Sequence, residues 1–135
     1  MKKSIGKFDN QELYLVVASY QNNNRIYLAV ETEEEGLYAD ITINLSDMLL
    51  PGKNYIFVSG DMSKDLRKFL EDKGIIGETI ETYQYNMGRY DMAKIDLELI
   101  KEYDPEGFKQ LEKNKTNDRD SRWVLFLYKE VRLCK

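Results

Sequence analysis

The side chains that could do chemistry in this chain are carboxylates, lysines and tyrosines, because the usual catalytic residues are nearly missing. The 135 residues include no histidine and one cysteine, Cys134, next to the last position. These counts exclude Ser–His and Cys–His nucleophile pairs, zinc sites that need imidazole, and iron–sulfur sites built from several thiolates. We therefore expect no cofactor, and any enzyme here would have to work with carboxylates or a magnesium ion.

One pair of carboxylates has the minimum spacing for a metal site. Asp118 and Asp120 stand two residues apart in "TNDRDS". An EF-hand calcium loop also needs a glycine at its sixth position and a glutamate at its twelfth, where this chain has Trp123 and Lys129. A solvated loop is therefore favoured over a metal site, and we expect neither catalytic residues nor metal ligands.

A second group of acids, in "ETEEEG", suits protein binding better than catalysis. The plainer interpretation is a charged hairpin tip that stays solvated and opposes aggregation. The functional one is an anionic patch beside tyrosines on the outer face of a sheet, which fits a basic protein partner because tyrosines supply buried area and acids steer the encounter. A helix of the same chain could instead cover the tyrosines. The candidate partner-binding residues are Tyr14, Tyr20, Tyr27, Tyr38, Glu31, Glu33, Glu34, Glu35 and Asp40.

The charge balance makes nucleic acid a less favoured partner. Twenty basic and twenty-four acidic residues leave a formal charge of −4, whereas phosphate binding needs a basic face. In "YQYNMGRYDM", residues 83–92, the bulky residues change from odd to even positions at Gly88. A strand bent by a bulge at Gly88 explains that change and is favoured over a base-stacking platform. A nucleic-acid site, as the alternative, would use Arg89, Arg119 and Arg122.

The elements that position these residues are predicted from periodicity. Apolar and polar residues alternate over 12–19, 25–31 and 37–45, which predicts an N-terminal antiparallel meander with turns at "QNNN" and "EEEG". A short strand over 55–58 follows the Pro51-Gly52 turn. The bent strand lies near 79–92, and the apolar run over 122–132 predicts a C-terminal strand.

Three short helices are predicted between and after these strands. Ser63 and Gly74 delimit the first, Asp96 caps a second over 97–103, and Asp104 with Pro105 begins a third. Residues 114–121 form a polar loop that we expect to be mobile. The prediction is one α+β domain over 1–135, with a mostly antiparallel sheet packed against two or three short helices.

The apolar runs are too short for a membrane span. The two longest, "LYLVVA" and "WVLFLY", have six residues each, whereas a bilayer requires about twenty. The start of the chain also lacks the apolar stretch of a secretory signal. We therefore expect a cytoplasmic protein that has no membrane partner. A homodimer through an edge or the tyrosine face of the meander stays open.

The order of several short motifs resembles a group of small uncharacterised proteins carried on conjugative transposons and related mobile elements of Gram-positive bacteria. The motifs are "DITINL", "NYIFV", "FLEDKGI", "GET" and "MGRYDMAKIDLELI", and the resemblance covers about residues 1–103. It implies an accessory protein of a mobile element and no assigned activity. Such proteins often bind a host protein.

Three hypotheses follow from the residues and this resemblance together. The first is a non-enzymatic accessory protein that binds a host protein and inhibits a defence or regulatory factor. The second is a nucleic-acid-associated accessory protein, and the third is a carboxylate- or magnesium-dependent enzyme.

Overall fold

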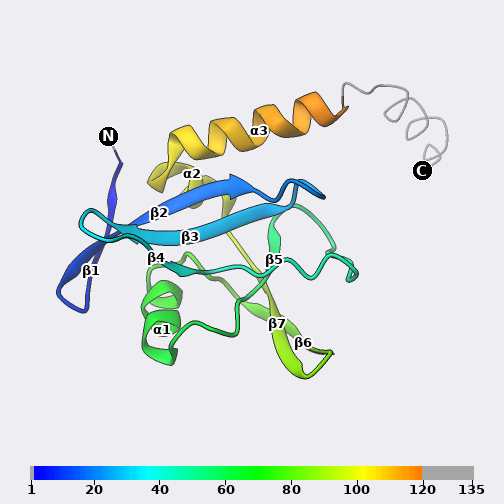
Figure 1. Ribbon diagram of the computed structural model, residues 1–135, viewed down its shortest axis with the longest axis horizontal. Helices are drawn as coiled ribbons and strands as arrows, with labels where there is room; N and C mark the ends of the chain where they lie inside the picture. The colour runs from blue at the N-terminus through cyan, green and yellow to red at the C-terminus, as the bar shows by residue number, and fades with distance from the viewer. Residues whose placement is uncertain (1, 120–135) are drawn as a thin grey trace.

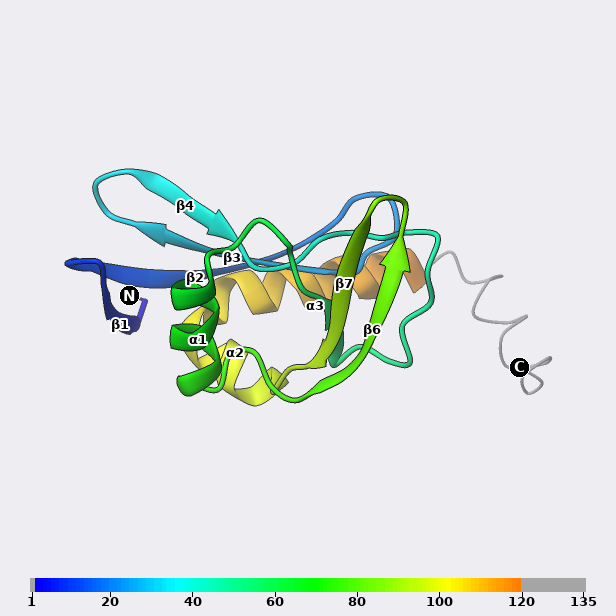
Figure 2. The ribbon, with the colours of Figure 1, turned by 90° about the horizontal axis from the view of Figure 1, so that it is seen from below.

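Two antiparallel sheets and three helices make up the computed structural model, which describes residues 2–119 (Figure 1). This confirms the predicted α+β class with mostly antiparallel sheet. Strands of the second sheet run across those of the first (Figure 2). None of the helices in the described range is long and apolar enough to span a bilayer.

The first sheet has four strands that lie side by side in chain order. The predicted meander is therefore confirmed, and it gains a strand at the N-terminal side that periodicity did not indicate. The strands are β1 (Ser4–Phe8), β2 (Gln11–Ser19), β3 (Ile26–Thr32) and β4 (Gly36–Asp40). Asp9 and Asn10 connect β1 to β2 with φ of 55° and 64°, the left-handed values that Asp and Asn tolerate in two-residue hairpin turns.

The second sheet corrects the prediction of one bent strand near 79–92. It contains β5 (Tyr55–Phe57), β6 (Thr79–Tyr85) and β7 (Gly88–Lys94), in the order β5-β7-β6. The chain reverses at Asn86, where φ is 55°, so 79–94 is a hairpin. Tyr83 pairs with Tyr90 across it. The bulky residues of 83–92 change from odd to even positions because the chain reverses, and not because of a bulge at Gly88.

The strand predicted over 37–45 is shorter than its alternation suggests, because β4 ends at Asp40. Beyond Asp40 the Ile41 N–H still donates to the Leu28 carbonyl of β3 over 2.8 Å, and the backbone then joins the second sheet. Thr42 bridges to Val58, and the Ile43 N–H donates to the Phe57 carbonyl over 3.0 Å. Arg25 holds the following loop by donating to the carbonyls of Leu45 and Met48. The alternation therefore continues through two different sheets.

The helices begin where local capping signals predict. Helix α1 (Lys64–Asp72) is capped by Ser63, whose hydroxyl accepts from the Leu66 N–H over 3.1 Å, and Gly74 follows it with φ of 81°. Helix α2 (Leu97–Tyr103) is capped by Asp96. Helix α3 (Pro105–Arg119) is capped by Asp104, whose carboxylate accepts from the Gly107 N–H over 3.2 Å.

The polar loop predicted over 114–121 is wrong at its start, because α3 continues to Arg119. Polar composition does not stop a helix, and residues 108–119 contain neither glycine nor proline. Extending a formed helix fixes one residue per hydrogen bond and so costs far less than starting one. The strand predicted over 122–132 lies outside the described residues.

The main core lies between the first sheet, the helices and the β5 side of the second sheet. Fully buried leucines and isoleucines come from all of these elements, and burying each contributes about 1.5–3 kcal/mol. Among them are Leu13, Leu15, Leu28, Ile56, Leu70 and Ile100. Helix α3 lies alongside β2 at one side of the first sheet, while α1 and the second sheet lie at the other (Figure 1).

Candidate binding surface

The first sheet has one aliphatic face and one face rich in tyrosine. Leu15 and Val17 of β2 are buried with Leu28 of β3. Side chains alternate along a strand, so the residues between them point the other way. On β2 and β3 these residues are half-buried from Tyr14 onward, except Ala29, which is fully buried. We define the acid–tyrosine face as these outward residues with the acids of the β3–β4 tip: Tyr14, Tyr20, Tyr27, Glu31, Leu37 and Asp40, with Glu33, Glu34 and Glu35 at the tip.

Tyr27 is held in place on this face by a hydrogen bond and a ring contact. Its hydroxyl donates to Asp40 Oδ1 over 2.6 Å, and its ring packs edge-on against Tyr20 with centroids 5.4 Å apart. The Tyr20 hydroxyl in turn lies 2.9 Å from Thr42 Oγ1. Burial, and then the hydrogen bond to Asp40, raise the pKa of Tyr27 far above its usual value. Tyr27 therefore stays neutral. Its hydrogen bond to Asp40 and its contact with Tyr20 favour one ring orientation, as suits a preorganised contact residue.

The four predicted glutamates divide into one that is paired and three that are exposed. Glu31 lies 3.3 Å from Lys2 Nζ, opposite Tyr14 on β2. The tip carries Glu33, Glu34 and Glu35, which are exposed and form no ion pair within the described residues. The Thr32 hydroxyl accepts from the Glu35 N–H over 3.0 Å, which fixes the turn. The tip thus presents adjacent negative charges from a defined backbone.

Tyr38 does not join the other tyrosines, and this corrects the predicted face. The register of β3 and β4 shifts between Val30 and Glu31, so that Tyr38 is an extra residue in β4. Tyr38 packs edge-on against Phe8, which contacts Phe69 of α1. A one-residue bulge exchanges the faces of the residues beyond it.

Leu37 is brought to the acid–tyrosine face by the same bulge. It stands opposite Glu31 and is 61% exposed, although the alternation of 37–45 predicts it in the core. Gly36, with φ of 78° at the start of β4, is a weak signal that a bulge could follow.

The arginines of the nucleic-acid alternative are not shown together. Arg89 is exposed on β7, opposite Gln84, and Arg119 is the last residue of α3. Arg122 lies outside the described residues. Within residues 2–119, no group of three or more acidic, cysteine or histidine side chains is placed to hold a metal ion.

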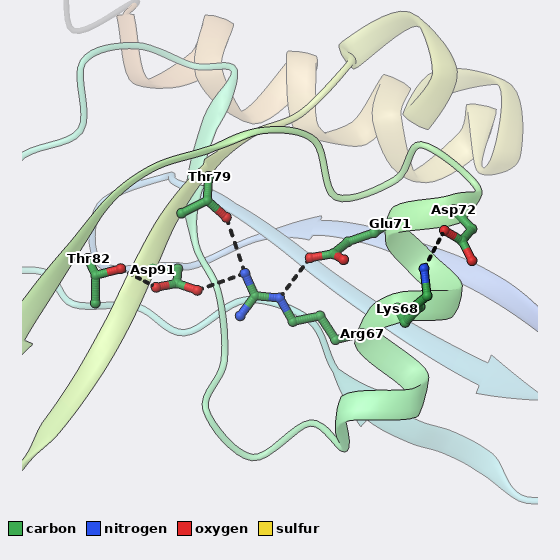
Figure 3. Close-up of polar contacts among 7 residues, drawn as sticks. All are labelled: Arg67, Lys68, Glu71, Asp72, Thr79, Thr82 and Asp91. Atoms are coloured by element: carbon green, nitrogen blue, oxygen red, sulfur yellow. Dashed lines mark hydrogen bonds and ion pairs between the residues drawn. The ribbon is translucent and has the colours of Figure 1, made fainter.

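A polar cluster that the sequence did not predict joins α1 to the second sheet (Figure 3). Arg67 lies 2.8 Å from Asp91 Oδ2 and 3.2 Å from Glu71 Oε2. Thr82 donates to Asp91 Oδ1 over 2.6 Å. The donation from Thr82, and then the charge of Arg67, hold the pKa of Asp91 below its ordinary value against the opposing effect of burial. The ion pairs of Arg67 are to Glu71 of α1 and to Asp91 of β7. The cluster therefore holds the β6–β7 hairpin against α1.

We expect the Asp91 carboxylate to make stability depend on acid pH. A carboxyl group whose pKa is lowered on folding contributes its full stabilisation when the pH is above its ordinary pKa of about 4. This stabilisation is lost as the pH falls through the pKa of the folded state. The free energy of unfolding of wild type should therefore exceed that of Asp91→Asn by a constant amount near neutral pH, and the two should converge below about pH 4. Urea titrations across this range measure the difference.

Asp72→Asn is the matched control, because Asp72 forms an exposed pair with Lys68 on the same helix (Figure 3). Exposed pairs contribute little, so this variant should follow wild type at every pH. A gap between wild type and Asp91→Asn that persists unchanged down to low pH would contradict the assigned protonation effect.

The fold and surface define a small α+β protein with a tyrosine- and acid-rich sheet face. The chain belongs to a family described as a domain of unknown function, DUF4313, whose model matches residues 14–115. The match begins in β2 and ends in α3, so it includes the whole acid–tyrosine face and the whole second sheet. No curated protein and no solved structure matches the chain.

Proposed function

We propose that this protein is a non-enzymatic binding module that docks a basic protein partner on its acid–tyrosine face. The motif resemblance to accessory proteins of mobile elements favours a host protein as that partner, and inhibition of a host defence or regulatory factor as the outcome. Acidic groups accelerate association with a basic surface, while tyrosines contribute contact area at a small entropic cost.

The observation that carries this proposal is that Tyr27, held by its contacts, and the exposed glutamates of the tip lie on the same surface. The Tyr27–Asp40 hydrogen bond of 2.6 Å holds the ring, and the exposed tip acids stand at the end of the strand that carries it. Leu37 adds an exposed apolar side chain between them. Apolar and aromatic contact area surrounded by charge is the usual composition of a transient protein interface.

Reversing two charges at the tip should weaken binding with little effect on folding. In Glu33→Lys with Glu35→Lys, the altered side chains are exposed and have no ion pair to another residue of 2–119 that could be lost. Lysines would repel a basic partner, so affinity should fall by about tenfold or more, mostly through slower association. Affinity capture from host lysate with quantitative mass spectrometry, followed by calorimetry on the purified partner, measures the change.

Glu102→Lys with Glu106→Lys serves as the control, since it changes net charge equally at exposed positions on α2 and α3. A specific partner is one that wild type and this control retain and the tip variant loses. If the tip variant retains every partner at wild-type affinity while its melting temperature is unchanged, the acid–tyrosine face is not the docking surface.

A further inference from the structure

Within residues 2–119, the second sheet ends in an edge whose protection is confined to its beginning, where β6 has an irregular register between Thr79 and Glu81. Strand β6 reads "TIETYQY", with five β-branched or aromatic residues and no lysine, proline or glycine. In the described chain it pairs with β7 alone, and its residues are exposed or only half-buried. Proteins normally block such edges with lysine, proline, bulges or a covering element, because free backbone groups recruit another strand.

The other strand edges in the described range are blocked. β1 contains Lys7 and an irregular register at Gly6, and β4 is bulged beside acids. On the outer side of β5, the Phe57 carbonyl accepts from Ile43. Where β2 extends past β1, the Val17 N–H donates to Asp104 under helix α3. Within the described residues, the part of β6 from Glu81 to Tyr85 is therefore an exception, because its register is regular and no strand pairs with its outer side.

The register of the hairpin shows which backbone groups are free. The Asp91 carbonyl accepts from the Val58 N–H over 2.8 Å, so it points away from β6. Thr82, paired with Asp91, is thus at a non-hydrogen-bonded position, and Gln84 has the same orientation because positions alternate. Thr82 and Gln84 direct their N–H and C=O groups out of the sheet.

We propose that β6 pairs antiparallel with β6 of a second copy of this chain, about a twofold axis at Tyr83. This register sets Thr82 opposite Gln84 of the second copy on both sides of the axis, so four outward N–H groups meet four carbonyls across the two strands. It uses residues 81–85 and leaves out the irregular register between Thr79 and Glu81. The two three-stranded sheets become one sheet of six.

The side chains of β6 are compatible with themselves in this register. Tyr83 meets Tyr83 of the second copy, which extends the aromatic row that Tyr83 already forms with Tyr90. Glu81, the only charged residue of β6, lies opposite Tyr85. The two Glu81 side chains are four residues apart along the strand direction, about 13 Å, so no like charges face each other. These features favour a second copy over an unrelated strand.

Sedimentation equilibrium over a range of concentrations tests this pairing. Wild type should change from 15.9 kDa to twice that mass as concentration rises. Gln84→Pro removes an outward N–H without removing a bond to β7, and proline is tolerated in edge strands at such positions. Its dimer dissociation constant should rise at least tenfold, while Gln84→Thr, a good strand former, should dimerise as wild type does.

Circular dichroism and melting curves establish that the variants are folded. If Gln84→Pro fails to fold, Thr82→Lys with Gln84→Lys replaces it, because it sets lysine against lysine across the axis and should likewise stay monomeric. Wild type that is monomeric up to about 0.5 mM would overturn the proposal. So would a dimer whose affinity survives in a folded edge variant, since that dimer would use another surface.

Discussion

Gly107→Ala is expected to lower the free energy of unfolding by about 1–3 kcal/mol, the usual cost of forcing extra volume into a packed site. A Cβ on Gly107 would lie 2.3 Å from Asp104 Oδ2 and 2.3 Å from the Val17 carbonyl oxygen. Neither atom can move cheaply, because one belongs to the backbone of β2 and the other to the carboxylate that holds it. We expect α3 to shift away from β2. Urea denaturation followed by circular dichroism measures the loss.

Gly52→Ala is the control for that loss. Neither Gly52 nor Gly107 has a positive φ, so the two sites differ in space and not in backbone strain. The nearest atom to a Cβ at Gly52 is Asn54 Oδ1 at 3.4 Å, the end of a side chain. This variant should be as stable as wild type or slightly more so. Equal stability of Gly107→Ala and wild type would mean that α3 does not approach β2 this closely.

Asp104→Ala is expected to cost about 2–4 kcal/mol, because one side chain does two tasks. Asp104 is 6% exposed. Its Oδ1 accepts from the Gly107 N–H over 3.2 Å and caps α3, while Oδ2 accepts from the Val17 N–H over 2.9 Å. Alanine would remove the cap and leave the buried N–H of Val17 without a partner. Urea denaturation is again the measurement.

Asp96→Ala separates the two contributions. Asp96 caps α2 by accepting from the N–H groups of Glu98 and Leu99, and it makes no side-chain bond to any strand that the structure describes. Its replacement should cost about 0.5–2 kcal/mol, the value of a cap alone. The excess loss in Asp104→Ala over Asp96→Ala then reports the bond to Val17 together with the ion pair to Lys2, whose Nζ lies 3.8 Å from Asp104 Oδ2. If the two variants lose the same stability, the contact between α3 and β2 contributes nothing measurable.

Helix starts and the central strands could be predicted from sequence, because their causes are local. The Ser63 and Asp96 caps act on N–H groups two or three residues away, and the alternation of β2 and β3 follows from the geometry of a single strand. The hairpin at 79–94 could not be separated from a bent strand in this way. A bulge and a chain reversal both move bulky residues from odd to even positions, and only the pairing of Tyr83 with Tyr90 distinguishes them.

The candidate surface was predicted only in part, because alternation is a local signal and a bulge is not. Tyr14, Tyr27 and Asp40 lie on one face because regular alternation holds through those positions. Tyr38 and Leu37 are exchanged because a bulge in β4 depends on how that strand pairs with β3, which leaves no periodic signal. The Arg67–Asp91 pair joins residues that are far apart along the chain, and neither residue type indicates its partner.

The amino-acid sequence by itself determined the secondary-structure class, most helix boundaries and the acidic tip. It also excluded the chemistry that requires histidine or several cysteines. Tertiary structure decided which tyrosines share a face, that residues 79–94 form a hairpin, and that no other strand of residues 2–119 pairs with the outer side of β6. The physical reason is range: caps and alternation act over a few residues, whereas faces and edges are set by pairing between strands distant in the chain. A sheet edge is open or closed only relative to every other element, so no local pattern can predict it.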